Sequence, residues 1–350
     1  MIDLIIHSTK KFIKTILDKV SLTGFIAICA FLLFFLWDFI IMGFNHSLAY
    51  YWVEQGDNAY QKAKYLDAIS YYEHALRLYP EHYMARYNLG NIYVAYEDYE
   101  KAVECYEETL KYKRDFTKAR IDLGIVLAER LYELDRAIWE YRQVATAKPD
   151  MTRLKEQKED KAIAYYNMGI AYKDKSLLLG DDRISVRNEL SNAVESYENS
   201  LKLRPSDYDT FYNLALTYQL LGDFPNAKKY YCKAINLKPF NYESHYNFAI
   251  LLSQNKRLYE SLEELEKAGL ILDSTGDSYL TVFVYDVLND VTQKAIAKNG
   301  TSGFVKNYDT HFNSKTEEIQ YRNGRVIIPD ELDEKILKNM KSCELCKEEK

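Results

Sequence analysis

The chain has 350 residues, of which 47% are hydrophobic and 28% charged, which is typical of a folded protein rather than a disordered one. Its 13 Gly and 6 Pro are too few for a β-sandwich or a barrel, and its 5 Cys are too few for a disulfide scaffold. The net charge of -6 gives no support to a nucleic-acid partner.

The first predicted element is a membrane span. Leu22–Met42 is apolar apart from Asp38, and at ~1.5 Å per residue such a helix covers about 31 Å, close to the roughly 30 Å of a bilayer core. The sequence therefore predicts a transmembrane helix over 22–44, which attaches the chain to a membrane through Leu22–Met42. A cleaved signal peptide stays as the alternative, although its apolar core is usually about 7–15 residues long.

Lysines precede this span within a basic leader over 1–21, whereas the first positive residue behind it is Lys62. The positive-inside rule then predicts a cytoplasmic N-terminus and an extracytoplasmic remainder. Cys105 and Cys232 stand against export, because both look unpaired and an oxidising compartment tolerates free thiols poorly. The leader itself fits either a short interfacial helix or an unstructured basic segment.

Behind the span, one string recurs. ARYNLGNIY begins at Ala85, ARIDLGIVL at Ala119, TFYNLALTY at Thr210 and SHYNFAILL at Ser244, so two intervals are 34 residues long. The intervals on either side of AYYNMGIAY, which begins at Ala164, are 11 and 12 residues longer. Apolar positions at three- and four-residue spacing predict two amphipathic helices in each repeat.

Small residues recur where we expect the two helices of a repeat to approach each other most closely, since a small side chain lets two backbones come together. Pro239 is one of four prolines that end the second helices, because Pro cannot continue a helix. The residues assigned to this structural role are Gly56, Ala68, Gly90, Ala102, Gly124, Ala137, Gly169, Ala193, Ala227 and Pro239.

The period, together with Tyr212-Asn213-Leu214-Ala215 and Gly222-Asp223-Phe224, resembles the tetratricopeptide repeat (TPR) family. The resemblance implies an all-α fold in which helix-turn-helix repeats form a right-handed superhelix. We expect six repeats within 49–275, followed by a capping helix over 277–298 and a partly disordered tail over 299–350. The repeats are expected at 49–82, 83–116, 117–151, 162–207, 208–241 and 242–275.

No catalytic motif occurs in the sequence, so we expect neither an enzyme nor a cofactor. The family resemblance implies that the first helices of the repeats line a concave groove that binds a peptide or helix of another protein. Aromatic and amide side chains suit such a ligand, although Tyr and Asn are also consensus residues of the family. The predicted groove residues are Tyr87, Asn88, Asn91, Lys118, Tyr166, Asn167, Tyr212, Asn213, Tyr246 and Asn247.

Some TPR proteins grip a carboxylate with Lys, Asn and Arg at fixed positions. On the first three repeats here that pattern falls on Val53, Asp57 and Asp122 as well as on Asn88 and Lys118. Three mismatches, one of them a repelling carboxylate, predict that this carboxylate-binding mode is absent. The sequence does not fix the oligomeric state, and a homo-oligomer stays open.

Cys343 and Cys346 form a single CxxC pair, which is half of a tetrahedral zinc site. Membrane-anchored TPR regulators of bacterial lipopolysaccharide assembly also combine a span, TPRs and a C-terminal zinc module, but that module has two CxxC pairs. This resemblance gives the alternative function, a zinc-assisted, cytoplasm-facing regulator of envelope assembly, with Cys343 and Cys346 as weak candidate ligands. The main prediction remains a membrane-anchored scaffold that binds another protein.

Overall fold

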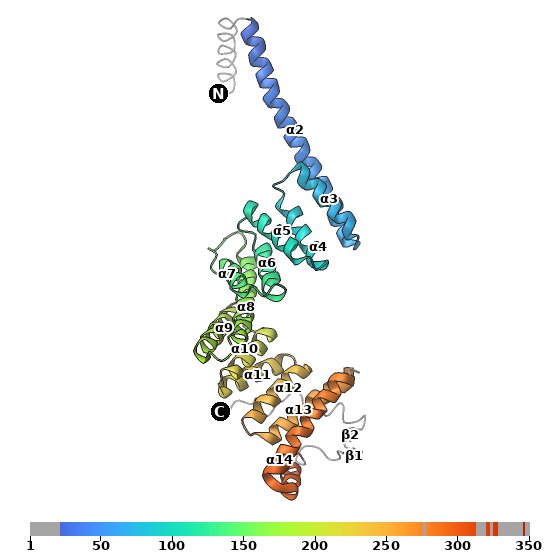
Figure 1. Ribbon diagram of the computed structural model, residues 1–350, viewed down its shortest axis with the longest axis vertical. Coiled ribbons are helices and arrows are strands. Elements are labelled where there is room, and N and C mark those ends of the chain that lie inside the picture. Colours follow the sequence, from blue (N-terminus) through green and yellow to red (C-terminus); the bar gives the residue numbers. More distant parts are fainter. Residues whose placement is uncertain (1–21, 276–277, 313–319, 323–324, 328–345, 347–350) are drawn as a thin grey trace. The chain divides into compact units, whose positions relative to one another are not determined.

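The computed structural model describes residues 22–275, 278–312, 320–322, 325–327 and 346, and these residues are almost entirely helical (Figure 1). They divide into two compact units, an N-terminal unit up to Ala119 and a C-terminal unit from Arg120 onward. Each unit is built from antiparallel helix pairs joined by short turns, as the alternation of amphipathic segments predicts.

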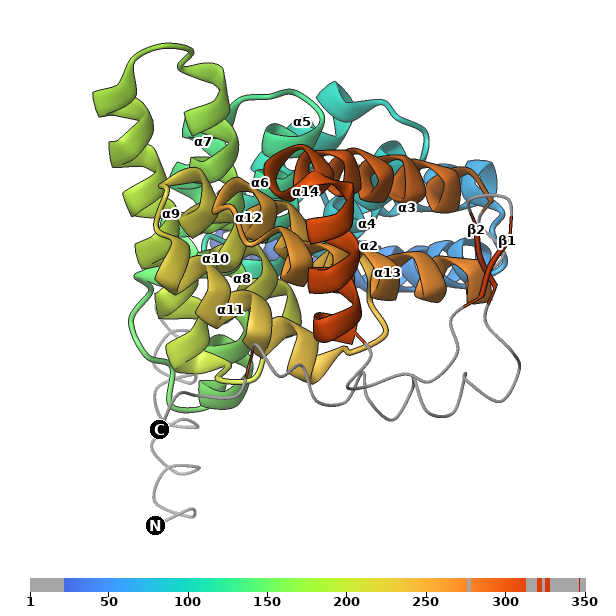
Figure 2. The same cartoon turned by 90° about the horizontal axis from the view of Figure 1, so that it is seen from below.

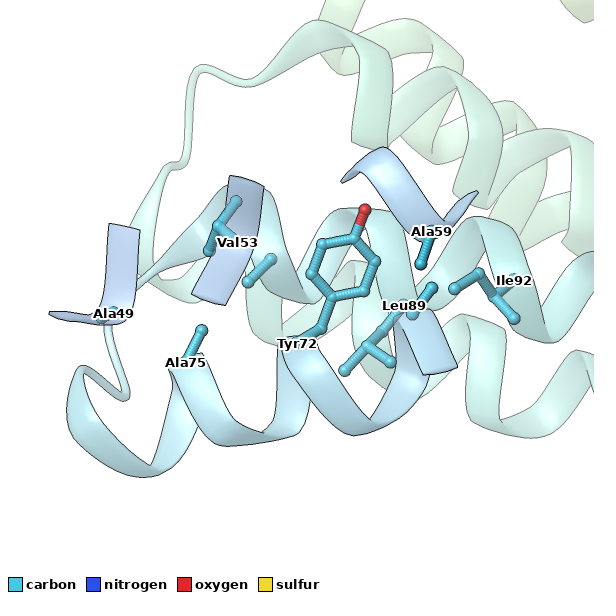
Figure 3. Close-up of a cluster of buried hydrophobic side chains, with 9 residues drawn as sticks. Ala49, Val53, Ala59, Tyr72, Ala75, Leu89 and Ile92 are labelled. Carbon is cyan, nitrogen blue, oxygen red and sulfur yellow. The ribbon is translucent and has the colours of Figure 1, made fainter. Parts of the chain in front are cut away.

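The N-terminal unit contains α2 (Leu22–Gln61), α3 (Tyr65–Leu78), α4 (Tyr83–Ala95) and α5 (Tyr99–Tyr112). Helix α2 packs against α3 and α4 packs against α5, while α3 also contacts α4. Side chains from α2, α3 and α4 form one buried cluster around the ring of Tyr72 (Figure 3). Short polar side chains begin two of these helices, because His82 and Asp98 accept hydrogen bonds from the first-turn amides of α4 and α5.

Helix α2 differs from the predicted arrangement of a span followed by a separate first repeat. It continues for 40 residues and includes both the apolar segment and the first helix of the first repeat. Among the described residues, no helix combines the length and the apolarity that crossing a bilayer requires. The predicted span over 22–44 is therefore not supported by the structure.

The C-terminal unit begins within α6 (Thr117–Glu129) and continues in helix pairs (Figure 2). The 25 residues of α8 and 21 of α9 make the fourth repeat longer than its neighbours, because the two insertions extend both helices. The remaining paired helices are α7 (Leu134–Ala145), α8 (Leu154–Leu178), α9 (Arg183–Leu203), α10 (Tyr208–Leu220), α11 (Phe224–Leu237), α12 (Tyr242–Gln254) and α13 (Leu258–Thr275).

The last helix, α14 (Ser278–Phe312), covers α13 and buries Val284 and Val291 against it. A solenoid needs such a cap because its terminal repeat otherwise exposes an apolar face. The predicted cap ends too early, since the helix resumes after Gly300, whose positive φ of 69° makes a kink. Beyond it, β1 (Gln320–Arg322) and β2 (Arg325–Ile327) form an antiparallel hairpin, so the described chain is not purely α-helical.

The small residues at the centre of each repeat are explained differently by the structure than by the sequence. Gly90 faces the ring of Tyr106 on the partner helix, and a Cβ at Gly90 would lie 2.7 Å from Cε1 of that ring. The space freed by glycine is therefore filled by an aromatic side chain, not by an approach of two backbones. The same pairing joins Gly56 with Tyr72, Gly124 with Tyr141, and Gly169 with Tyr197.

The alanines that the sequence places in the second helices are fully buried. Tyr72, Tyr106, Tyr141, Tyr197 and Tyr231 are also among the largest fully buried side chains. Pro239 lies two residues beyond the end of α11. The buried alanines are Ala68, Ala102, Ala137, Ala193 and Ala227.

Candidate functional site

The predicted groove residues of the C-terminal unit all lie in one register on the first helices α8, α10 and α12. In each of these repeats a Tyr stands three residues, and an Asn two residues, before the small central residue. All six side chains are half-buried. We call this set the Tyr–Asn row, and it comprises Tyr166, Asn167, Tyr212, Asn213, Tyr246 and Asn247.

Two asparagines of the Tyr–Asn row are bound to the preceding repeat. The Nδ2 group of Asn213 donates to Oη of Tyr166 at 3.1 Å, and that of Asn247 donates to Oη of Tyr212 at 2.7 Å. Each amide also donates to a backbone carbonyl four residues earlier on its own helix, that of Asp209 or Glu243. Both N–H donors of each amide are therefore used, and these asparagines tie neighbouring repeats together.

Asn167 occupies the same register but has no such partner. In the preceding repeat, the position of the tyrosine is taken by Ile121, which offers no hydroxyl. No hydrogen bond to the Asn167 side chain is formed by any residue that the structure describes. Its carboxamide is thus half-buried on the row with its donors and its acceptor open to a ligand.

Lys173 joins the Tyr–Asn row, although the sequence analysis did not identify it. Its Nζ atom donates to Oδ1 of Asn213 at 3.0 Å, and burial lowers its pKa. Burial also raises the pKa of the neighbouring Asp174 carboxyl. A lysine in the last turns of a repeat's first helix gives no sequence signal for this contact, because its partner lies 40 residues away.

Burial raises the pKa of the row's tyrosines, so they remain protonated donors throughout the physiological pH range. For Tyr166 the value is about 12, with Asp209 adding to the effect of burial. The pKa values of Tyr212 and Tyr246 are raised mainly by burial as well. The row therefore presents aromatic faces with neutral hydroxyls and amides, which can bond to a peptide backbone.

Three of the four predicted groove residues of the N-terminal unit, Tyr87, Asn88 and Asn91, make side-chain contacts within that unit. Asn88 donates to Oδ1 of Asp57 at 2.9 Å, and Asn91 accepts from Oη of Tyr106 at 2.8 Å. The ring of Tyr87 lies 5.0 Å from that of Phe116, and Lys118 is exposed at the start of α6. Asp57, at which the carboxylate-binding pattern fails, instead accepts from Oη of Tyr72 at 2.6 Å.

The cysteines differ from the expectation. Cys232 is not a free thiol, because it forms a disulfide with Cys346. Cys346 thus has no thiolate to offer a metal in this state, and Cys343 lies outside the described residues. Within the described part of the chain, no group of three or more His, Cys, Asp or Glu side chains is arranged to hold a metal ion.

Comparison with known proteins identifies the repeats. Tetratricopeptide repeat profiles match residues 59–129 and 208–241, and a TPR repeat profile matches 187–222. Among solved structures, Pseudomonas aeruginosa pilF has a TM-score of 0.52 at 16% identity, and the match covers 69% of this chain and 98% of pilF. That likeness supports the fold alone.

Curated relatives match over part of their length. The Drosophila melanogaster BBSome complex member BBS4 homolog is 26% identical over 161 residues, which cover 45% of this chain and 28% of that protein. The Mus musculus DnaJ homolog subfamily C member 3 is 24% identical over 251 residues, which cover 64% of this chain and 49% of that protein. Tetratricopeptide repeat profiles thus match two stretches of this chain, and in both stretches the structure has paired helices.

Proposed function

We propose that this chain is an adaptor that holds a segment of another protein against the Tyr–Asn row of α8, α10 and α12. The observation that carries the proposal is Asn167, whose half-buried carboxamide has no partner among the described residues, whereas Asn213 and Asn247 are fully engaged as donors. Because this carboxamide is only half-buried, water reaches it in the free protein, and a bound peptide group would take the place of that water.

The chemistry of the row favours an extended peptide. A peptide group offers one donor and one acceptor, which match the acceptor and donors of the Asn167 carboxamide. Tyr212 and Tyr246 add aromatic surface with low loss of conformational freedom. One relative is named as a member of a multiprotein complex, which agrees with an adaptor role.

The test compares two asparagines of the same register. We expect Asn167→Ala to weaken partner binding about tenfold, as the loss of one or two hydrogen bonds predicts, without changing the free energy of unfolding. Asn213→Ala is the matched control, because it removes contacts within the protein and therefore lowers stability. A photo-crosslinking side chain at position 167 should capture a protein that one at the exposed Tyr132 does not. Equal capture from both positions contradicts the proposal.

We further propose that the N-terminal part of α2 attaches the adaptor to a lipid bilayer. Large apolar side chains on this part of the helix are more than half exposed, and lysines precede it in the sequence. These exposed side chains include Ile26, Phe31, Leu32, Phe34, Leu36, Trp37 and Ile40. The lysine distribution favours an extracytoplasmic repeat domain.

Flotation with phosphatidylcholine vesicles that contain an anionic lipid tests the attachment. The full-length chain should float with the vesicles, and the double variant Phe31→Asp, Phe34→Asp should remain in the dense fraction. The matched control is Tyr132→Asp, which introduces the same charge at another exposed aromatic position. Flotation of the double variant together with the wild type contradicts the attachment.

A further inference from the structure

The Cys232–Cys346 disulfide joins two residues that are 114 positions apart, with their Cα atoms 5.2 Å from each other. Cys232 lies on α11, and Cys346 belongs to the C-terminal CxxC sequence. The chain between the two cysteines contains α12, α13 and α14, which are the last repeat and its cap. The disulfide therefore closes a covalent loop of chain that includes the last repeat and its cap.

The two sulfur atoms differ in access. Cys232 is 7% exposed and follows the fully buried Tyr231, whereas Cys346 is half-buried. An attacking thiolate can therefore reach the sulfur of Cys346 more readily than that of Cys232. Such an attack forms a bond to Cys346 and breaks the bond to Cys232, so that Cys232 must leave as a buried thiolate.

A buried thiolate is a poor leaving group. The free thiol of Cys105 illustrates this effect, because burial raises its pKa to about 12. Exchange slows as the pKa of the leaving thiol rises. Attack at Cys346 is thus disfavoured by its leaving group, and attack at Cys232 is disfavoured by burial, for as long as α11 stays folded.

We propose that this disulfide is a permanent clasp that fastens the C-terminal end of the chain to α11 and that forms in an oxidising compartment. Its formation removes two protons and two electrons from the two thiols, and a disulfide-bearing exchange protein of that compartment accepts the electrons. This proposal gives Cys346 a structural role in a disulfide, in place of a metal site. It does not depend on which partner the Tyr–Asn row binds.

Reduction kinetics of the full-length protein test the clasp. Purified protein is treated with excess dithiothreitol, quenched by alkylation and digested, and the peptides of Cys232 and Cys346 are followed by mass spectrometry. We expect reduction of the native protein to be at least tenfold slower than reduction of the same protein unfolded in urea. Equal rates, or free Cys232 and Cys346 thiols before reduction, overturn the proposal.

Three variants separate this pairing from the other cysteines. Cys346→Ser should leave Cys232 as a thiol and lower the thermal midpoint of the C-terminal unit. Cys343→Ser and Cys105→Ser are the matched controls, and both should retain the linked peptide. The compartment is tested by acid quenching and alkylation of intact source cells, in which the linked peptide is expected. Recovery of both residues as thiols from those cells overturns the assignment to an oxidising compartment.

Discussion

The ring of Tyr106 occupies the volume that a side chain at Gly90 would need, since a Cβ there would lie 2.7 Å from Cε1 of the ring. Gly90 lies in α4 and Tyr106 in α5, so the contact fixes how the two helices of one repeat pack. The hydroxyl of the same ring donates to Oδ1 of Asn91 at 2.8 Å. One tyrosine thereby provides both the packing and a polar link across the hairpin.

Substitution of Gly90 by Ala should lower the free energy of unfolding. Overpacking of a filled core costs about 1–3 kcal/mol, which exceeds the ~1 kcal/mol that Ala gains over Gly in helix propensity. Gly43→Ala is the matched control, because no atom lies within 4 Å of a Cβ at that position and only the propensity gain remains. Urea denaturation of both variants measures the difference. A stabilised Gly90→Ala protein would contradict the packing described here.

The bond between Asn213 and Tyr166 predicts a loss of stability when either side chain is shortened. Asn213→Ala removes two hydrogen bonds donated by the amide and one that it accepts from Lys173. We expect a loss of about 1–3 kcal/mol, because the partners that remain are half-buried. Tyr166→Phe removes a single bond and should cost less. Chemical denaturation monitored by circular dichroism gives both values, and an unchanged midpoint for Asn213→Ala would refute the link between repeats.

His82 makes the N-terminal unit sensitive to acid. Its Nδ1 atom accepts from the amide of Ala85 at the start of α4, so this nitrogen must be unprotonated. Burial lowers its pKa from the ordinary value of 6.5, and His46 of α2 adds to this effect. Of the other groups that face it, Asp57 acts in the opposite direction, while the rings of Tyr50 and Tyr79 pack beside it.

Because the folded pKa lies below 6.5, the unfolded chain binds more protons, and the stability contributed by His82 is lost as the pH falls below 6.5. His82→Asn keeps a capping side chain that does not titrate, and should therefore flatten the pH profile below pH 6.5. His74→Asn, at an exposed histidine of α3, should leave the profile unchanged. Hydrogen exchange of the first amides of α4 measures the effect, and identical wild-type and His82→Asn profiles would exclude it.

A buried ion cluster joins α12 to α13. Nδ1 of His245 lies 2.6 Å from a carboxylate oxygen of Glu264, and Nζ of Lys267 lies 2.7 Å from the other. Burial alone would raise the pKa of Glu264, but Lys267 and His245 lower it to about 2. Since that pKa lies below the ordinary value of 4.5, the stability from Glu264 is present above pH 4.5 and is lost as the pH falls toward 2.

Glu264→Gln leaves the charge of Lys267 without its buried partner and removes the carboxylate that His245 contacts. Breaking such a pair costs roughly 3–5 kcal/mol, so we expect a large drop in the thermal midpoint at pH 7. Glu260→Gln, which breaks a more exposed pair with Arg257, is the control and should cost less than about 1 kcal/mol. Comparable losses in the two variants would contradict the role assigned to burial.

The repeats could be predicted because their helices depend on a short-range signal, the three- and four-residue spacing of apolar residues. It does not reveal which side chain fills the space beside Gly90, since that depends on the rotation of one helix against the other. The link from Asn213 to Tyr166 was also hidden, because an insertion separates the two residues by 47 positions. Cys232 looked unpaired for a similar reason: its partner is 114 residues away, and spacing alone carries no information about such pairing.

The tyrosines of the second helices share one packing role but differ in how their hydroxyls are satisfied. Asp57 and Asn91 accept from Tyr72 and Tyr106 at the position after the central glycine. In the fourth repeat that position is Ile170, and the hydroxyl of Tyr197 has no partner among the described residues. The change from a polar residue to Ile170 after the central glycine can be read from the sequence. Its effect on the tyrosine hydroxyl is seen only in the structure, where the ring packs against that glycine.

Helix α2 extends without a break from the apolar segment into the contact with α3. At ~1.5 Å per residue its 40 residues form a helix about 60 Å long. The described helix contains neither proline nor a residue with positive φ, which are two common causes of a kink. The apolar segment that begins at Leu22 and the first helix of the first repeat belong to one continuous helix. The orientation of that apolar segment is therefore coupled to the orientation of the first repeat.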